Sequence, residues 1–319
     1  RTSDVVEMTA TVVPIPPLPA TQLRIAQIAT GSFHSVALTE LGEVFSWGSG
    51  RFGRLGHGRQ SDEPRPRAIR ALHALRVQGI CAGKFHTMCI VEDGNIYAWG
   101  RGDEGQLGVR LSAKSVFTVP RCVNFFRFLP RDERARYIFA GRRHTFAISA
   151  SGFVYCWGRN VEGQLGLSYS SDAVMTPQVN FQLSGKHIIA LACSNHTLAL
   201  TINGRVLSFG KGDRFQLGRG EQGNRHDPMV IDRLLHTRIV HVAAALHHSV
   251  CLDNRGRVYT FGWNRSGQLG HGSTANKGFP TRIESAICSQ AKQIVCSKWA
   301  TRVLITPAAN AITPAPWCD

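Results

Sequence analysis

A motif that recurs five times at nearly constant spacing constrains the fold of this chain more than any other sequence feature. Each copy starts with His followed by Ser or Thr, has a Gly eight residues after the His, and ends in Leu-Gly. The histidines are His34, His86, His144, His196 and His248. Successive histidines are 52, 58, 52 and 52 residues apart, so one copy carries six extra residues. Self-similarity at such a period indicates a repeat architecture.

Within each copy the residue pattern is typical of β-structure. The apolar runs 36–38 and 44–47 are separated by Gly42, which permits the positive φ of a tight turn, so they predict a β-hairpin. The second strand ends in an aromatic residue followed by Gly, and these aromatic residues are Trp47, Trp99, Trp157, Phe209 and Phe261. One unit cannot bury its apolar face alone, whereas several units arranged radially can. We therefore expect an all-β fold, a β-propeller of four-stranded blades.

These recurrent residues carry a family resemblance. The pattern Ala-x-Gly-x-x-His-Ser/Thr, followed by Trp-Gly and Gly-Gln-Leu-Gly, resembles the repeat of the regulator of chromosome condensation family and covers essentially the whole chain. WD-repeat propellers have a shorter period with a Trp-Asp signature, and kelch repeats have a paired Gly that is absent here. The resemblance implies a propeller with one of two uses: nucleotide exchange on a Ran-type small GTPase with chromatin docking, or protein–protein scaffolding in larger assemblies.

The repeat boundaries predict a single domain over residues 1–319. Full repeats are assigned to residues 31–82, 83–140, 141–192, 193–244 and 245–296. The two remaining ends, 1–30 and 297–319, are expected to supply one split blade, so that N- and C-terminal strands close a ring of six blades. The family resemblance implies seven blades instead, and the closing unit has Thr313 and Pro314 where the other units have Trp-Gly or Phe-Gly.

The charge balance favours anionic partners. Lys and Arg number 37 against 21 Asp and Glu, which gives a formal net charge of +16, although charged residues make up only 18% of the chain. The shortage of acidic residues therefore contributes as much as the surplus of basic ones. A surface of this kind attracts nucleic acids and other polyanions.

One long connection between repeats is rich in arginine and aromatic residues. Together with a basic stretch in the preceding unit, it forms the candidate nucleic-acid or partner patch, which consists of Arg121, Arg127, Arg131, Arg134, Arg136, Arg142, Arg143, Phe125, Phe126, Phe128, Arg65, Arg67 and Arg70, with Arg76 nearby. Arginine among aromatic side chains suits phosphate contact with base stacking. The alternative is an outer strand with apolar residues inward and a solvated basic face.

No motif points to catalysis, a metal or a cofactor. The sequence has no Gly-x-Ser-x-Gly elbow, Walker loop or His-Glu-x-x-His helix, and the stretches 48–53 and 100–105 match Gly-x-Gly-x-x-Gly only as turns between β-segments. The five recurrent histidines are carried apart around a ring, so we expect buried imidazoles that bond backbone within each blade rather than metal ligands. No apolar run approaches the ~18 residues that span a bilayer, so we expect no membrane insertion.

The nine cysteines are odd in number and lack Cys-x-x-Cys pairs, which favours a reducing, intracellular compartment. The first residue is Arg1, so we expect a processed or truncated product, either one that has lost a transit peptide or one domain of a longer scaffold. We therefore expect a non-enzymatic basic propeller that acts as an interaction scaffold. It would dock on a nucleic-acid-rich assembly such as an organellar ribonucleoprotein or ribosome, with other proteins and RNA as partners, in the mitochondrion ahead of the nucleus. The alternative is an exchange factor for a Ran-type GTPase with chromatin association.

Overall fold

The computed structural model describes residues 24–109, 116–284, 291–297 and 300–305. Blade one comprises β1 (Ile25–Thr30), β2 (His34–Thr39), β3 (Val44–Gly48) and β4 (Glu63–Ala68). Blade two comprises β5 (Val77–Ala82), β6 (His86–Val91), β7 (Ile96–Arg101) and β8 (Val116–Cys122). Blade three comprises β9 (Ala135–Ala140), β10 (His144–Ser149), β11 (Val154–Asn160) and β12 (Ser171–Val179).

The second half of the chain continues the same plan. Blade four comprises β13 (Ile188–Cys193), β14 (His196–Thr201), β15 (Val206–Gly210) and β16 (Arg225–Val230). Blade five comprises β17 (Ile239–Ala244), β18 (His248–Asp253), β19 (Val258–Gly262) and β20 (Lys277–Arg282). A last hairpin comprises β21 (Ala291–Cys296) and β22 (Thr301–Ile305). Single helical turns occur at η1 (Arg51–Gly53), η2 (Arg70–Leu72), α1 (Asn124–Arg127) and η3 (Asp232–Leu234).

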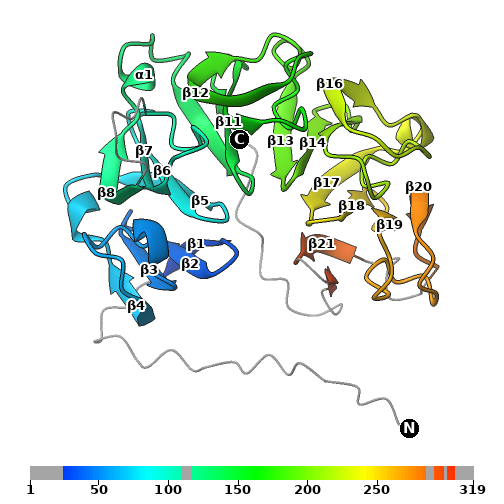
Figure 1. Ribbon diagram of the computed structural model, residues 1–319, viewed down its shortest axis with the longest axis horizontal. Coiled ribbons are helices and arrows are strands. Elements are labelled where there is room, and N and C mark those ends of the chain that lie inside the picture. The colour runs from blue at the N-terminus through cyan, green and yellow to red at the C-terminus, as the bar shows by residue number, and fades with distance from the viewer. Residues whose placement is uncertain (1–23, 110–115, 285–290, 298–299, 306–319) are drawn as a thin grey trace, which may run out of the picture.

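The blades follow one another around an arc, with the first strand of each blade toward the centre and the fourth at the periphery (Figure 1). All sheets are antiparallel, so the expected all-β, four-stranded blade is what the structure has. Among the described strands, none hydrogen-bonds the last hairpin to blade one. The strands expected to close a ring fall largely in residues 1–23 and 306–319, outside the described residues, so closure and the count of six or seven blades stay predictions.

The boundaries of the blades are shifted by one strand relative to the boundaries of the sequence repeats. Strand β1 pairs with β2, with Ile28 opposite Ala37, so residues 25–30 form the inner strand of blade one and not part of a closing blade. Each repeat from one His-bearing turn to the next therefore holds three strands of one blade and the first strand of the following blade. The assignment of 1–30 to a split blade was wrong for these six residues, because the chain crosses from one blade to the next before the recurrent His and not at it.

The apolar cores lie between blades rather than within them. One cluster joins Leu38 and Ile69 of blade one to Trp99 of blade two, and four similar clusters fill the later junctions. Strands β6, β10, β14 and β18 are buried along their whole length, which explains their nearly continuous apolar sequences. Trp99 and Trp157 are fully buried, whereas Trp47 on blade one is only half-buried.

Side-chain hydrogen bonds between a recurrent His and a Ser or Thr of the next blade, which we call the latch, join each blade to the next. At the junction of blades two and three, the Nε2 of His86 lies 3.2 Å from the Oγ1 of Thr145, and that hydroxyl donates to the carbonyl of Gln106 at 3.0 Å. The indole Nε1 of Trp157 donates to the same carbonyl at 3.0 Å. Equivalent imidazole–hydroxyl pairs are His34–Thr87, His144–Thr197, His196–Ser249 and His248–Thr301. The expectation that these imidazoles bond backbone within one blade was wrong: they bond a hydroxyl of the next blade.

Candidate functional site

The two ends of the blades form two rims, which we call upper and lower. The upper rim carries the turns before each recurrent His, such as residues 31–33, and the β3–β4 type of loop, such as residues 49–62. The lower rim carries the β2–β3 type of turn, such as residues 40–43, and the connections between blades, such as residues 69–76. Because side chains at opposite ends of a six-residue strand lie roughly 20 Å apart, a ligand of ordinary size meets one rim only.

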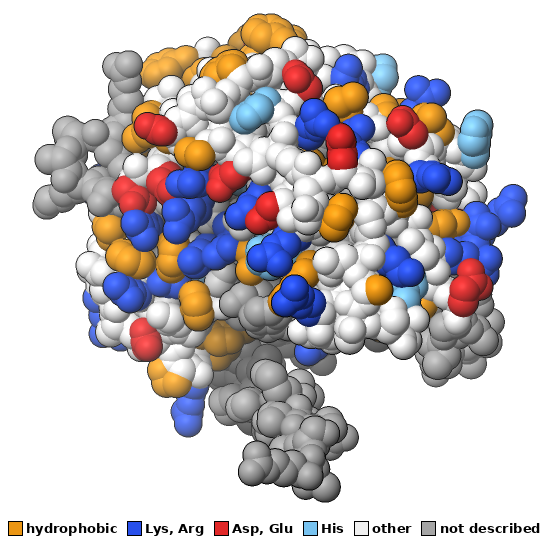
Figure 2. All heavy atoms as spheres, turned by 45° about the vertical axis from the view of Figure 1, so that its right-hand side comes forward, with side chains coloured by type: hydrophobic (Ala, Val, Ile, Leu, Met, Phe, Trp, Pro, Cys, Tyr) orange, Lys and Arg blue, Asp and Glu red, His pale blue; other side chains and the backbone are white. Residues whose placement is uncertain are grey.

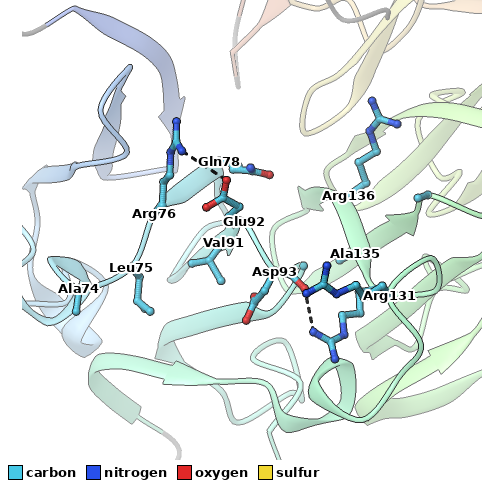
Figure 3. Close-up of a pocket in the computed structure, with 13 residues that line it drawn as sticks. Ala74, Leu75, Arg76, Gln78, Val91, Glu92, Asp93, Arg131, Ala135 and Arg136 are labelled. Atoms are coloured by element: carbon cyan, nitrogen blue, oxygen red, sulfur yellow. Dashed lines mark hydrogen bonds and ion pairs between the residues drawn. The ribbon is translucent and has the colours of Figure 1, made fainter.

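The lower rim holds a cavity of about 770 Å³ between blades two and three. Its lining includes Arg76 from the connection before β5, Glu92 and Asp93 from the β6–β7 turn, and the β8–β9 connection with the start of β9. The last two segments supply Arg131, Arg134 and Arg136. Arg76 and Glu92 lie on one side of the cavity, and Arg131 and Arg136 lie on the other (Figure 3). Four arginines thus face two carboxylates, which makes this part of the rim electropositive.

Three of these arginines differ in the contacts that their guanidinium groups make. The guanidinium of Arg134 donates to the carbonyls of Leu129 at 3.0 Å, Asp93 at 3.2 Å and Arg127 at 3.2 Å, so it fixes the connection to the neighbouring turn. Arg76 meets Glu92 at 3.5 Å, with both side chains largely exposed, and such a pair contributes little. The exposed Arg131 makes no side-chain hydrogen bond or ion pair to the described chain. Arg76 and Arg131 are therefore the side chains best placed to meet an external anion.

Most of the aromatic residues in this connection belong to the core. The single turn α1 directs Phe126 inward, where it is fully buried at 5.3 Å from the ring of Tyr155 and 5.8 Å from that of Trp157. Phe125 is half-buried against Tyr155. Only Phe128 is free of the core, with 82% of its surface exposed. The predicted interleaving of arginine and aromatic side chains is thus reduced to Phe128 between the exposed Arg127 and Arg131.

The rest of the predicted patch is dispersed. Arg142 and Arg143 follow β9 on the upper rim, at the opposite end of that strand from Arg131 and Arg134. Arg143 pairs with Glu104 at 2.7 Å, and Arg159 pairs with the same carboxylate at 2.6 Å. Arg143 therefore belongs to an ion-pair network with Glu104 and Arg159, and neither Arg142 nor Arg143 lies beside the cavity.

The outer-strand arginines do not reach the cavity either. Arg65 and Arg67 lie on β4, where Arg67 pairs with Glu63 at 2.8 Å, and Arg70 begins η2. Arg121 lies on β8 with its guanidinium 5.8 Å from the ring of Phe117. Lys and Arg are spread over the visible face and interspersed with Asp and Glu (Figure 2). Of the basic stretch in blade one, only Arg76 joins the arginines of the long connection.

The described residues offer no catalytic constellation that an external substrate reaches. Ser46 and His57 resemble a nucleophile and its base, with the Nε2 of His57 3.0 Å from the Oγ of Ser46. The hydroxyl is fully buried and donates to the carbonyl of Leu55 at 2.6 Å, and Thr260 and His271 repeat the arrangement in blade five. Within the described ranges, no three His, Cys, Asp or Glu side chains converge as a metal site. No helix in that part of the chain is long and apolar enough to cross a membrane.

Comparison with known proteins identifies the family. The family model for the RCC1-like domain matches residues 2–302. The chain belongs to the RCC1-like domain family. The ultraviolet-B receptor UVR8 of Arabidopsis thaliana is 31% identical over 289 residues, which is 90% of this chain and 64% of the receptor. The E3 ubiquitin-protein ligase HERC2 of Homo sapiens is 32% identical over 291 residues, which is 89% of this chain and 6% of the ligase. The chain thus spans less than two thirds of the length of these curated relatives.

Two solved structures share the fold of this chain. Prp20p of Saccharomyces cerevisiae matches with a TM-score of 0.76 at 24% identity, covering 87% of this chain and 67% of that one. Human WBSCR16 matches with a TM-score of 0.77 at 22% identity, covering 91% of this chain and 75% of that one. At these identities the likeness shows the fold and carries no residue roles.

Sequence reasoning missed part of the arrangement at both rims. It did not find Glu92 and Asp93, because the β6–β7 turn lies far from the long connection in sequence and only the blade packing brings them together. It also missed a cluster of phenylalanines around Arg54 on the upper rim. One signal could have revealed that cluster: Arg54 interrupts the Gly-Gln-Leu-Gly motif, in which the other four copies have Gln.

Proposed function

We propose that this RCC1-like propeller is a non-catalytic docking domain whose lower rim binds an anionic partner at the cavity between blades two and three. The observation that carries the proposal is the convergence of Arg76 and Arg131, from two connections 55 residues apart, on one cavity lined by four arginines and two carboxylates. The planar guanidinium group of arginine can donate two parallel hydrogen bonds to one phosphate or carboxylate group. On the upper rim, by contrast, Arg101, Arg143 and Arg159 are paired with carboxylates.

Nucleic acid is the anion that we favour at this site. Phe128 is exposed between Arg127 and Arg131, and such a side chain offers a ring for stacking while the guanidinium groups meet phosphates. The net charge of +16 favours association with a polyanion over the whole surface. The finer proposal is therefore a scaffold on a nucleic-acid-rich assembly such as an organellar ribonucleoprotein, in the mitochondrion ahead of the nucleus, and imaging of the tagged full-length protein tests that location.

Binding of labelled nucleic acid tests the site. We expect a double variant, Arg76→Ala with Arg131→Ala, to bind fluorescein-labelled single-stranded RNA about tenfold more weakly than the parent chain at about 100 mM salt, because it loses two phosphate contacts. The matched control is Arg65→Ala with Arg265→Ala, which removes the same charge from exposed positions away from the cavity. Equal losses in the two double variants would show that charge acts without a site, and would contradict the proposal.

A second candidate function is nucleotide exchange on a Ran-type small GTPase with chromatin association. It is supported by the fold shared with Prp20p, whose structure is described together with its binding to Gsp1p and histones. Release of labelled GDP from a panel of small GTPases tests it directly. Acceleration with one member would support this function, and unchanged release with every member would exclude exchange for that panel.

A further inference from the structure

The upper rim carries a compact cluster of phenylalanines and cations at the junction of blades one and two. The guanidinium carbon of Arg54 lies 5.7 Å from the ring centre of Phe33, 5.9 Å from that of Phe52 and 5.0 Å from that of Phe85. Phe52 and Phe85 meet edge to face, with ring centres 5.3 Å apart. Arg54 is thus enclosed by three aromatic rings that come from two blades.

This cluster departs from the repeat at the residues that build it. The other four copies have Gln at the position of Arg54, namely Gln106, Gln164, Gln216 and Gln268. Phe52 adopts a φ of 62°, a left-handed conformation that is costly for a bulky residue. Strain of this kind persists only where the surroundings impose it, and it concentrates at functional sites. The blade fold does not require Phe52 or Arg54, since the four other copies have Glu104, Glu162, Arg214 and Ser266 at the first position and Gln at the second.

The buried cation forms no ion pair with a carboxylate in the described chain, and Asp62 attracts it only from beyond ion-pair distance. Arg54 is 1% exposed, and its Nε donates to the carbonyl of Arg51 at 2.7 Å while an Nη donates to the carbonyl of Lys84 at 3.3 Å. Buried charges are normally paired with an opposite charge. Arg54 instead is repelled by the exposed Arg51, and it shares the rings of Phe52 and Phe85 with Arg101, whose own partner is Asp103. The cluster therefore has a surplus of positive charge at a partly apolar surface.

The exposed part of the cluster is apolar. Phe33 has 60% of its surface exposed on the turn before His34. The rings of Phe52 and Phe85 are already engaged by cations: Arg51 and Arg101 lie 4.8 and 5.0 Å from the centre of Phe52. Their faces are therefore not open for base stacking, which nucleic-acid binding to aromatic platforms requires. A protein partner fits better, because Arg and aromatic side chains dominate the energetics of protein interfaces.

We propose that Phe33, Phe52, Phe85 and Arg54 form a docking site for an acidic protein segment that carries an apolar side chain. The apolar side chain of the segment covers Phe33, and its carboxylates meet the cations around the rings. Charge complementarity identifies the class of segment, since the cluster supplies cations and exposed aromatic surface, and no carboxylate of the described chain is in ion-pair contact with Arg54. This site is separate from the lower-rim cavity and does not depend on the function proposed there.

Selection of peptides from a random display library on the purified chain tests this proposal. We expect the enriched peptides to combine Asp or Glu with an aromatic or aliphatic residue, and to bind Phe33→Ala at least tenfold more weakly than the parent. Arg54→Gln introduces the residue that four other repeats have at this position, so we expect this variant to fold. It should bind the same peptides more weakly than the parent. Phe181→Ala removes another exposed phenylalanine, on the lower rim and with 82% of its surface exposed, and serves as the control.

Enriched peptides without acidic residues, or acidic peptides that bind Phe33→Ala and Arg54→Gln as well as the parent, would overturn the proposal. Displacement of the bound peptides by single-stranded RNA would also overturn the proposal, because the ring faces would then be open to bases. Thermal unfolding of each variant confirms that a lost interaction does not reflect a lost fold. Arg131→Ala should leave peptide binding unchanged, so failure here is distinguishable from failure at the lower rim.

Discussion

At the scale of single residues, the latch between blades explains why the same residue types recur. The Oγ1 of Thr145 donates to the carbonyl of Gln106, so the Nε2 of His86 must donate to that hydroxyl. Nε2 therefore carries the proton, and Nδ1 has no partner in the described chain. Recurrent spacing alone predicted that the histidines are structural. It could not reveal that they act between blades, because the partner hydroxyl is a neighbour only after the blades pack.

Removal of one latch hydroxyl tests its contribution to stability. Thr145→Val keeps the shape of the side chain but leaves the Nε2–H of His86 buried without an acceptor. We expect the free energy of unfolding to fall by about 1–3 kcal/mol, which is the usual cost of stranding a buried polar group. Urea denaturation followed by tryptophan fluorescence measures the change. Thr274→Val, at an exposed position, is the control, and an equal effect of both substitutions would refute the latch.

The latch histidines also predict a pH dependence of stability. Burial, with smaller effects from Arg54 and His86, lowers the pKa of His34 to about 3, and burial lowers that of His86 to about 4. The pKa values of His144, His196 and His248 are lowered to about 3, 3 and 4. Imidazoles of the unfolded chain bind protons below about pH 6.5, whereas those of the folded chain stay neutral. The unfolded state then binds more protons, so the free energy of unfolding falls as the pH drops from 6.5 toward 4.

Urea midpoints measured at pH 7.5, 6.0 and 5.0 check this dependence. His196→Gln removes one titrating group, so the loss of stability below pH 6.5 should be shallower by up to about 1.4 kcal/mol per pH unit than in the parent. Identical pH profiles for the parent and this variant would show that His196 already titrates normally in the folded chain.

At the scale of elements, prediction succeeded where the chain repeats and failed where it departs from the repeat. The hairpins, the glycine turns and the burial of Trp99 follow from a pattern seen five times. The long connection occurs once, so no second copy showed which of its aromatic side chains point inward. The single turn α1 decides that Phe126 is core and Phe128 is surface, and this choice depends on packing against Tyr155 of the next blade.

Two neighbouring arginines of this connection should behave differently. Arg134→Ala removes three hydrogen bonds to carbonyls, so we expect the free energy of unfolding to fall by about 1–2 kcal/mol and amide exchange to rise in residues 124–134. Arg131→Ala should change stability by less than about 0.5 kcal/mol, because this exposed side chain makes no such bond. Hydrogen exchange of both variants checks the contrast, and equal protection in the two would contradict the assigned roles.

At the scale of the whole molecule, the arc of blades places charged side chains at two rims. Net charge is a property of the composition, so the sequence could predict an electropositive surface but not where uncompensated cations remain. The structure separates Arg143, which is paired on the upper rim, from Arg131, which has no ion pair in the described chain and lies on the lower rim, although only eleven residues lie between them. Strand β9 runs between these positions and carries the chain from one rim to the other.

The salt dependence of RNA binding tests the central claim most directly. Each neutralised phosphate adds about 0.7 to the slope of log affinity against log salt for a single strand. Between about 50 and 200 mM salt, we predict that Arg76→Ala with Arg131→Ala lowers this slope by about 1.4, whereas Arg65→Ala with Arg265→Ala leaves it nearly unchanged. A slope that falls equally in both double variants, or in neither, would contradict a defined anion site on the lower rim.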